Sequence, residues 1–201
     1  MMTDSPGHTG QLAGKSVLRI ACPKTNSGGT AFLHKSGKVI TAAHILKGNN
    51  ASDIFLINTK GKKVLIREIT TDFDLDIALL TPKSKLRGPS FPVSTASQFT
   101  IGSQVSTWGY PTGYGSASPL LSVGWLSGQD LIKNEAGKKV KRWMVNVAIN
   151  LGNSGGPLID VETGQVIGIV SIKLAPLPQG IQKELEALSK QKSGFGYTKT
   201  F

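Results

Sequence analysis

The sequence predicts an all-β protein built from closed antiparallel barrels. Glycine is abundant, with 24 residues in a chain of 201, and short runs rich in Val, Ile and Thr recur between the glycines. Such runs fit a pleated, half-buried surface, and helix-forming patterns do not dominate the chain. About a dozen of these runs occur at the short, even spacing that is typical of barrels with tight turns.

The first half of the chain contains strands in hairpin order. The runs on either side of Lys35-Ser36-Gly37 predict one hairpin, and the turn at Lys60-Gly61 predicts another. The strands expected here are residues 15–23, two runs within 25–44, and residues 53–58, 63–70 and 76–80.

A linker is expected next, because residues 81–100 are rich in Pro, Ser and Thr. We therefore divide the chain into three parts. They are a tail at residues 1–14, a first barrel at 15–95 and a second barrel at 96–201.

The second half repeats the strand pattern, with one interruption. Ile181, Leu185 and Leu188 recur at helical spacing with charges between them. Residues 179–192 are therefore predicted to form one short helix near the C-terminus, which either packs on the surface or acts as a lid over a site. The strands expected in this half are residues 104–110, 120–128, 138–149, 156–160, 165–173 and 194–201.

The chain is basic, with a formal net charge of +11. Its Lys and Arg residues fall in small groups beside Gly or Pro, which indicates solvated turns. The alternative is a patch that attracts an acidic protein, a nucleic acid or a membrane surface. Aromatic residues do not interleave these groups, which argues against nucleic-acid binding. The groups are Lys60, Lys62 and Lys63; Lys83, Lys85 and Arg87; and Lys138, Lys139, Lys141 and Arg142.

Cys22 is the single cysteine of the chain, which excludes an intrachain disulfide and fits a reducing compartment. It ends an apolar run, so we expect a buried structural thiol. The polar N-terminus lacks the apolar core of a signal peptide, and no apolar run is long enough to cross a bilayer. We therefore expect a cytoplasmic protein without a membrane span.

The strongest chemical motif is Gly152-Asn153-Ser154-Gly155-Gly156-Pro157-Leu158. A serine hydroxyl is a weak nucleophile unless a base takes its proton and an oxyanion is stabilised. Flanking glycines let the backbone turn tightly, which leaves the hydroxyl exposed and the amides free. The N–H groups of Gly152 and Ser154 could then converge on an oxyanion. The loop alone could be an ordinary turn, but the whole string is more specific.

A histidine and an aspartate occur in two earlier motifs. His44 ends the string Thr41-Ala42-Ala43-His44, whose small residues permit close packing beneath the imidazole. Asp76 opens the apolar run Ile77-Ala78-Leu79-Leu80, and a buried carboxylate needs hydrogen bonds. An imidazole N–H would supply one and would fix the histidine tautomer. Asp72 and Asp74 are alternatives, but only Asp76 directly adjoins the apolar run.

These motifs, in the order His, Asp, Ser, resemble the trypsin/chymotrypsin superfamily of serine peptidases rather than the subtilisin or α/β-hydrolase arrangements. Residues 148–154 and 165–169 are most similar to the HtrA/Deg branch. The resemblance spans about residues 17–201 and implies a chymotrypsin-like double barrel of two six-stranded barrels. It also implies that Ser154 attacks the scissile carbonyl, His44 acts as base and then acid, and Asp76 orients His44.

The resemblance further implies where a protein or peptide substrate binds. Gly152, Asn153 and Ser154 would form the oxyanion hole, and the backbone of Ser171, Ile172 and Lys173 would pair with the substrate. The remaining substrate-binding positions are Ala148, Ile149, Asn150, Leu151 and Phe195. Ala148 stands where an aspartate would favour Lys or Arg. A small or medium apolar residue before the scissile bond is therefore expected, although Lys173 could instead favour an acidic one.

Two departures from the family concern regulation. Asn153 replaces the aspartate that pairs with a new N-terminus in digestive members, so activation by that salt bridge is not expected. The chain shows no PDZ domain after residue 201, so PDZ-dependent regulation is not expected. A binding module on a peptidase scaffold and a latent peptidase switched on by a protein partner remain alternatives. His8 and His34 lie outside any metal-ligand spacing, so we expect no metal and no cofactor.

Overall fold

The structure is a computed structural model that describes residues 13, 15–86, 88–95, 99–133 and 137–172. In this part the regular elements are β-strands and short 3₁₀ helices, which confirms the all-β prediction. The helices are η1 (Pro23–Thr25), η2 (Ala43–Leu46) and η3 (Ala51–Asp53). None of the helices in these ranges is long and apolar enough to span a bilayer.

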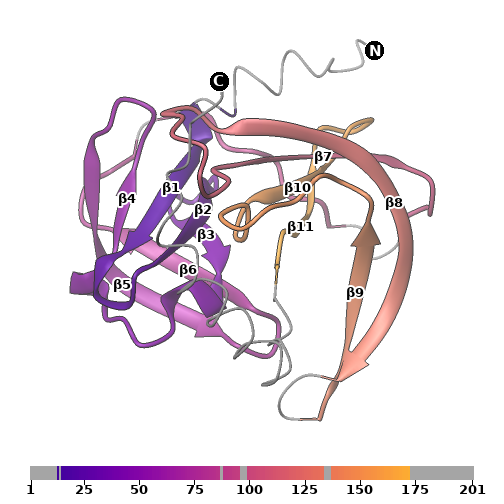
Figure 1. Cartoon of the computed structure of the whole chain (residues 1–201), viewed down its shortest axis with the longest axis horizontal. Coiled ribbons are helices and arrows are strands. Elements are labelled where there is room, and N and C mark those ends of the chain that lie inside the picture. The colour runs from indigo at the N-terminus through magenta and orange to yellow at the C-terminus, as the bar shows by residue number, and fades with distance from the viewer. Residues whose placement is uncertain (1–12, 14, 87, 96–98, 134–136, 173–201) are drawn as a thin grey trace, which may run out of the picture.

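The first six strands form a closed antiparallel barrel in the order β1-β2-β3-β6-β5-β4 (Figure 1). They are β1 (Val17–Cys22), β2 (Ser27–Leu33), β3 (Val39–Ala42), β4 (Phe55–Ile57), β5 (Lys63–Asp72) and β6 (Ile77–Pro82). Alternate side chains such as Ile20, Leu56 and Leu80 fill the barrel and are fully buried. Period-two alternation therefore sends the intervening polar side chains, including Arg19, to the outside.

The next five strands form a second antiparallel sheet in the order β11-β10-β7-β8-β9. They are β7 (Gln104–Gly109), β8 (Leu120–Lys133), β9 (Lys139–Val145), β10 (Pro157–Asp160) and β11 (Val166–Ile169). In Figure 1 the long strand β8 arches around the side of the molecule away from the first barrel. The predicted strand at 194–201 and helix at 179–192 lie outside the described residues, so the sixth strand of the second barrel stays a prediction.

A shared apolar cluster joins the two halves. Val17 and Phe32 of the first barrel pack with Phe91 of the linker and with Tyr110 and Ile159 of the second half. The linker also pairs with β11, because the N–H of Ser94 donates to the carbonyl of Val166 at 2.9 Å. The two halves are thus held together by buried contacts, while the exact boundary at residues 95 and 96 stays a prediction.

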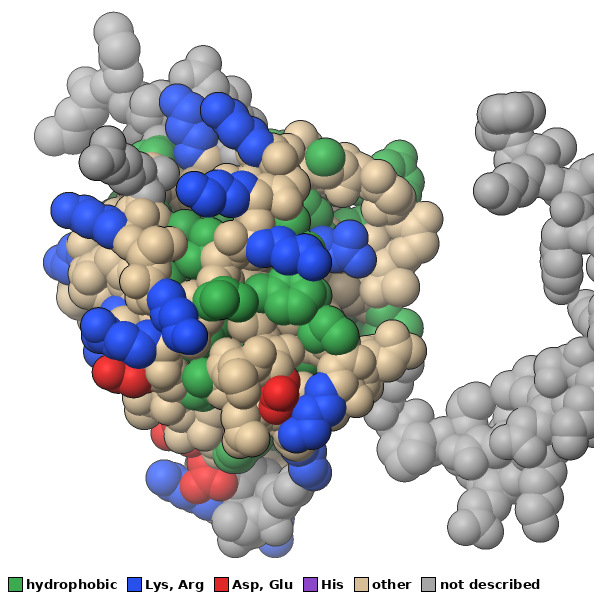
Figure 2. All heavy atoms as spheres, turned by 90° about the vertical axis from the view of Figure 1, so that its left-hand side faces the viewer, with side chains coloured by type: hydrophobic (Ala, Val, Ile, Leu, Met, Phe, Trp, Pro, Cys, Tyr) green, Lys and Arg blue, Asp and Glu red, His purple; other side chains and the backbone are tan. Residues whose placement is uncertain are grey.

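Basic side chains are scattered over the face of the first barrel that is turned away from the second sheet (Figure 2). Two lysines nevertheless lie over aromatic rings, which the sequence order does not indicate. The Nζ atom of Lys63 is 4.6 Å from the centre of the Phe55 ring, and that of Lys141 is 4.6 Å from the Trp143 ring. The first pair joins the neighbouring strands β5 and β4, and the second joins alternate residues of β9. The order of residues within the basic groups does not indicate either pair.

Candidate active site

His44 lies in η2, directly after the end of β3. Ala42 and Ala43 beneath it are fully buried, which lets the backbone approach the barrel core. The His44 side chain keeps 29% of its surface exposed. Its ring is therefore anchored at the base and accessible at the tip.

Asp76 holds His44 through two hydrogen bonds. The Oδ2 atom lies 2.8 Å from Nδ1 of His44, and Oδ1 accepts the His44 backbone N–H at 2.9 Å. Asp76 itself has a φ of 58°, in the left-handed region that Asp and Asn tolerate better than other non-glycine residues. Of the competing carboxylates, Asp72 is exposed and accepts the Leu75 N–H in a local turn, and the hydrogen bonds of the described residues link His44 to Asp76 and not to Asp74. The structure thus brings Asp76, rather than Asp72 or Asp74, to the histidine.

A third donor reaches the same carboxylate from the second half of the chain. The hydroxyl of Ser171 donates to Oδ2 of Asp76 at 2.5 Å. Burial of Asp76 alone would raise its pKa, but the bonds from the His44 ring, the Ser171 hydroxyl and the His44 N–H together lower the pKa below its ordinary value. The ionised carboxylate needs a proton on Nδ1 of His44, so Nε2 is left as the acceptor.

Ser154 lies in a tight loop in which two positions require glycine. Gly152 and Gly155 have φ values of 93° and 87°, and a Cβ on either would collide with backbone atoms of neighbouring segments. Thr30 of β2 holds the loop from below, because its hydroxyl donates to the Gly152 carbonyl at 2.7 Å. Its N–H also donates to the Ser154 carbonyl at 2.8 Å. Two hydrogen bonds from the first barrel therefore hold the serine loop of the second half of the chain.

Two backbone donors in this loop have no acceptor among the residues that the structure describes. Among the hydrogen bonds of the described residues, none uses the N–H of Gly152 or of Ser154. The N–H of Asn153, in contrast, donates to the Asn150 carbonyl at 3.0 Å. Asn153 thus shapes the loop, and the two donors available for an oxyanion are those of its neighbours.

The hydroxyl of Ser154 rests against Ile172. Its Oγ accepts the Ile172 N–H at 3.1 Å. A Ser154–His44 hydrogen bond is not among those formed within the described ranges. Accepting one bond leaves the serine proton and a second lone pair available.

The predicted substrate-binding residues divide into three sets. Ala148, Asn150 and Leu151 are exposed in the loop before Ser154, and Ile149 is half-buried against the core of the second sheet. Ser171 and Ile172 lie beside the candidate triad, as described above. Lys173 and Phe195 lie outside the described residues.

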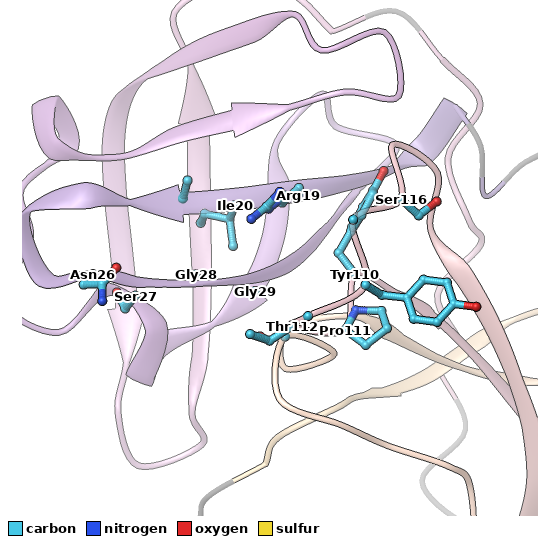
Figure 3. Close-up of a pocket in the computed structure, with 15 residues that line it drawn as sticks. Arg19, Ile20, Asn26, Ser27, Gly28, Gly29, Tyr110, Pro111, Thr112 and Ser116 are labelled. Carbon is cyan, nitrogen blue, oxygen red and sulfur yellow. The ribbon is translucent and has the colours of Figure 1, made fainter. Parts of the chain in front are cut away.

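Two cavities flank the site. One, of about 330 Å³, contains Asp76 and Ser171 and is lined mainly by β9 and β11. The other, of about 410 Å³, contains Gly152 and lies between the β1–β2 hairpin and the loop at residues 110–116 (Figure 3). They share no lining residue.

The structure also identifies side chains whose roles the motifs do not indicate. The Ser171 hydroxyl and the Thr30 side chain both support the site, whereas sequence reasoning considered only the backbone at 171. A serine that interrupts the apolar run from Val166 to Ile172 is the one local signal for the first.

The remaining reactive side chains are not part of the candidate triad. Cys22 is fully buried, and burial raises the pKa of its thiol despite a hydrogen bond with Ser27. His34 bonds Ser36 in the turn after β2. No group of three or more His, Cys, Asp or Glu that could hold a metal occurs in the described part.

A family model described as "Trypsin-like peptidase domain" matches residues 29–169. This range contains His44, Asp76 and Ser154. The chain belongs to this family. Within the trypsin-like peptidase domains, it is similar to the serine protease Do-like HtrA of Lactobacillus helveticus, with 30% identity over 78% of this chain and 38% of the relative. It is also similar to Protease Do-like 1, chloroplastic, of Arabidopsis thaliana, with 31% identity over 74% of this chain and 34% of the relative.

The fold of this trypsin-like domain also matches solved structures. Deg5 superposes with a TM-score of 0.65 and 26% identity, covering 81% of this chain and 82% of Deg5. The Rv3671c protease of M. tuberculosis in its active form superposes with a TM-score of 0.68 and 22% identity, covering 100% of this chain and 88% of the protease. The curated relatives and Deg5 confirm the HtrA/Deg resemblance. The chain spans little more than a third of the length of the curated relatives named above.

Proposed function

We propose that this trypsin-like domain is a serine endopeptidase that hydrolyses peptide bonds in protein substrates. Ser154 is the nucleophile, His44 is the general base and then the general acid, and Asp76 orients His44. The observation that carries the proposal is the chain of hydrogen bonds from Ser171 to Asp76 to His44, set beside a serine whose loop offers two free N–H donors.

The reaction follows from these atoms. Nε2 of His44 takes the Ser154 proton as Oγ attacks the substrate carbonyl carbon, and Asp76 stays ionised while it stabilises the imidazolium. The N–H groups of Gly152 and Ser154 donate to the oxyanion, an interaction that preorganised donors make strongest in the transition state. His44 then protonates the leaving amine, and water hydrolyses the acyl-enzyme by the same proton path in reverse.

Substrate preference is the finer part of the proposal. Ala148 carries no charge to pair with Lys or Arg, and Ile149 adds an apolar side chain to the same loop. We therefore expect that this loop accepts a small or medium apolar residue before the scissile bond. Cleavage of a peptide library chiefly after Lys or Arg would contradict this assignment.

The test of the activity is digestion of a mixed peptide library by the purified protein, with products read by mass spectrometry. The proposal expects new termini with wild type and none with Ser154→Ala. Ser106→Ala is a matched control, because Ser106 is a buried serine of β7 that makes none of the hydrogen bonds described for the site. Equal cleavage by wild type and Ser154→Ala would overturn the proposal.

A second candidate is a peptidase that rests in a latent state. The observation that favours it is the Ser154 hydroxyl held by the Ile172 N–H rather than by His44. Exchange of that bond by an incoming substrate strand or by a protein partner would then precede chemistry. This candidate expects a lag in product formation that shortens as peptide concentration rises, whereas linear progress curves from the first turnover would exclude it.

A further inference from the structure

The cavity beside Gly152 is a pocket of mixed polar and apolar lining, built by both halves of the molecule (Figure 3). One wall is the β1–β2 hairpin, with Arg19, Asn26 and Ser27, and the other is the loop that starts at Tyr110. The Tyr110 hydroxyl crosses between the walls and donates to the Val17 carbonyl at 3.3 Å. The pocket therefore has a fixed shape that links the barrel to the loop.

The position of this pocket relative to Ser154 indicates which residues of a substrate would enter it. This assignment rests on the proposed peptidase function. The acyl side of the substrate is expected along residues 171–172, next to the cavity that contains Asp76 and Ser171. The scissile carbonyl lies at the N–H groups of Gly152 and Ser154. A chain that continues past Gly152 enters the other cavity, so this cavity receives residues that follow the scissile bond.

Arg19 is the charged residue among those that line this pocket. It stands at an outward position of β1, paired with Thr30 of β2, because its neighbours Leu18 and Ile20 point into the barrel. No ion pair within the described ranges involves Arg19. Its guanidinium is therefore available to a ligand.

The electrostatics of the pocket are positive. Burial raises the pKa of Tyr110 to about 12, and the nearby charge of Arg19 opposes that rise. Tyr110 is therefore neutral at physiological pH, and no carboxylate among the lining residues offsets Arg19. A guanidinium presents a planar fork of donors that matches a carboxylate.

We infer that Arg19 selects substrates with Asp or Glu at one of the first two positions after the scissile bond. The carboxylate of that residue would pair with the guanidinium inside the pocket beside Gly152. Arg19 is thus a specificity-determining residue on the leaving-group side.

The experiment compares peptides that differ only at these two positions, with Glu, Gln or Lys, around a sequence that the library digestion shows to be cut. For wild type, kcat/KM for Glu should exceed that for Lys by about fivefold, as expected for a partly exposed ion pair. Arg19→Gln should remove the preference, and Arg19→Glu should reverse it. Arg67→Gln, a change to an exposed arginine of β5, should preserve it. The wild-type preference should shrink as ionic strength rises.

Binding of the same peptides to Ser154→Ala, followed by fluorescence anisotropy, gives a readout that does not need turnover. If wild type cleaves nothing, that result overturns the peptidase proposal, and peptides of the same design are then chosen without the digestion. A Glu preference in binding that Arg19→Gln removes would in that case still show that Arg19 recognises a carboxylate. A Glu-to-Lys ratio within about twofold of unity in this binding assay would overturn the inference. So would a preference that survives Arg19→Gln, even if cleavage is efficient.

Discussion

Replacing Ser171 by alanine should change how stability depends on pH, because its hydroxyl donates to a buried carboxylate. Asp76 is 3% exposed, and the bond to its Oδ2 is 2.5 Å long. Hydrogen bonds to charged groups contribute about 1.5–3 kcal/mol. Ser171 itself is exposed, so water can enter the space left by the hydroxyl. We therefore expect the lower value, a loss of about 1.5 kcal/mol near pH 7.

The sign of the pH dependence follows from the lowered pKa of Asp76. A group whose folded pKa is depressed contributes stability above its unfolded pKa and loses it as pH falls through the folded pKa. In Ser171→Ala the folded pKa of Asp76 should rise, because one of the hydrogen bonds that lower it is lost. Its contribution to stability is then smaller and is lost at a higher pH. The difference between the two proteins should fall to about 1 kcal/mol or less once Asp76 is protonated in both.

The assay is urea unfolding followed by tryptophan fluorescence between pH 7 and pH 3. Ser106→Ala is the control, since this buried serine is not among the donors to Asp76 and should give a difference that does not vary with pH. Peptide turnover by Ser171→Ala at pH 8 should fall only a few-fold, because both bonds between Asp76 and His44 remain. A stability loss below about 0.5 kcal/mol, or one independent of pH, would refute the assignment of the Ser171 hydroxyl.

Three further changes test other parts of the site. Asp76→Asn should lower kcat by about 10⁴-fold, because an amide favours the wrong His44 tautomer; a loss below about tenfold in a kinetic assay would contradict this role. Gly152→Ala should destabilise the protein by at least about 2 kcal/mol in urea unfolding and abolish turnover, since φ of Gly152 is 93° and a Cβ there would collide with Tyr110 and Thr112. A variant as stable as wild type would contradict this expectation. Cys22→Ser should cost about 1–3 kcal/mol of stability, because it places a hydroxyl in an apolar core, but it should leave kcat/KM unchanged. Loss of kcat/KM in the folded variant would contradict a purely structural thiol.

The fold was largely predictable because its signals are local. Glycine-containing turns such as Lys60-Gly61 separate short apolar runs, and β4 and β5 pair across that turn as expected. Strand lengths were harder to predict. β8 continues to Lys133 rather than ending near residue 128, because it pairs with β9 through Leu131 and Lys141. The residues between Leu131 and Lys141 are mostly polar, so the sequence does not indicate that β8 and β9 pair there.

The candidate site was predictable only where its residues carry a motif. His44, Asp76 and Ser154 each belong to a short motif that explains the local backbone, and the structure brings His44 and Asp76 into contact. The supports of the site come from distant positions. Ser171 is 95 residues from Asp76, and Thr30 is 122 residues from Gly152. No spacing rule connects such pairs, because the packing of one half against the other creates them.

Arg19 illustrates the same limit for specificity. Its outward position follows from the alternation of β1, but the pocket it lines is completed by a loop some ninety residues further along the chain. The sequence therefore predicts an exposed arginine and not what that arginine faces.

The central claim is that Ser154 is an activated nucleophile, and labelling by a fluorophosphonate probe tests it most directly. We predict that the purified wild-type protein forms a covalent adduct on Ser154, located by mass spectrometry. Ser154→Ala should form none, His44→Ala should react far more slowly, and the Ser106→Ala control should label like wild type. A folded wild-type protein that stays unlabelled, or one that labels elsewhere with Ser154 unmodified, would contradict the account.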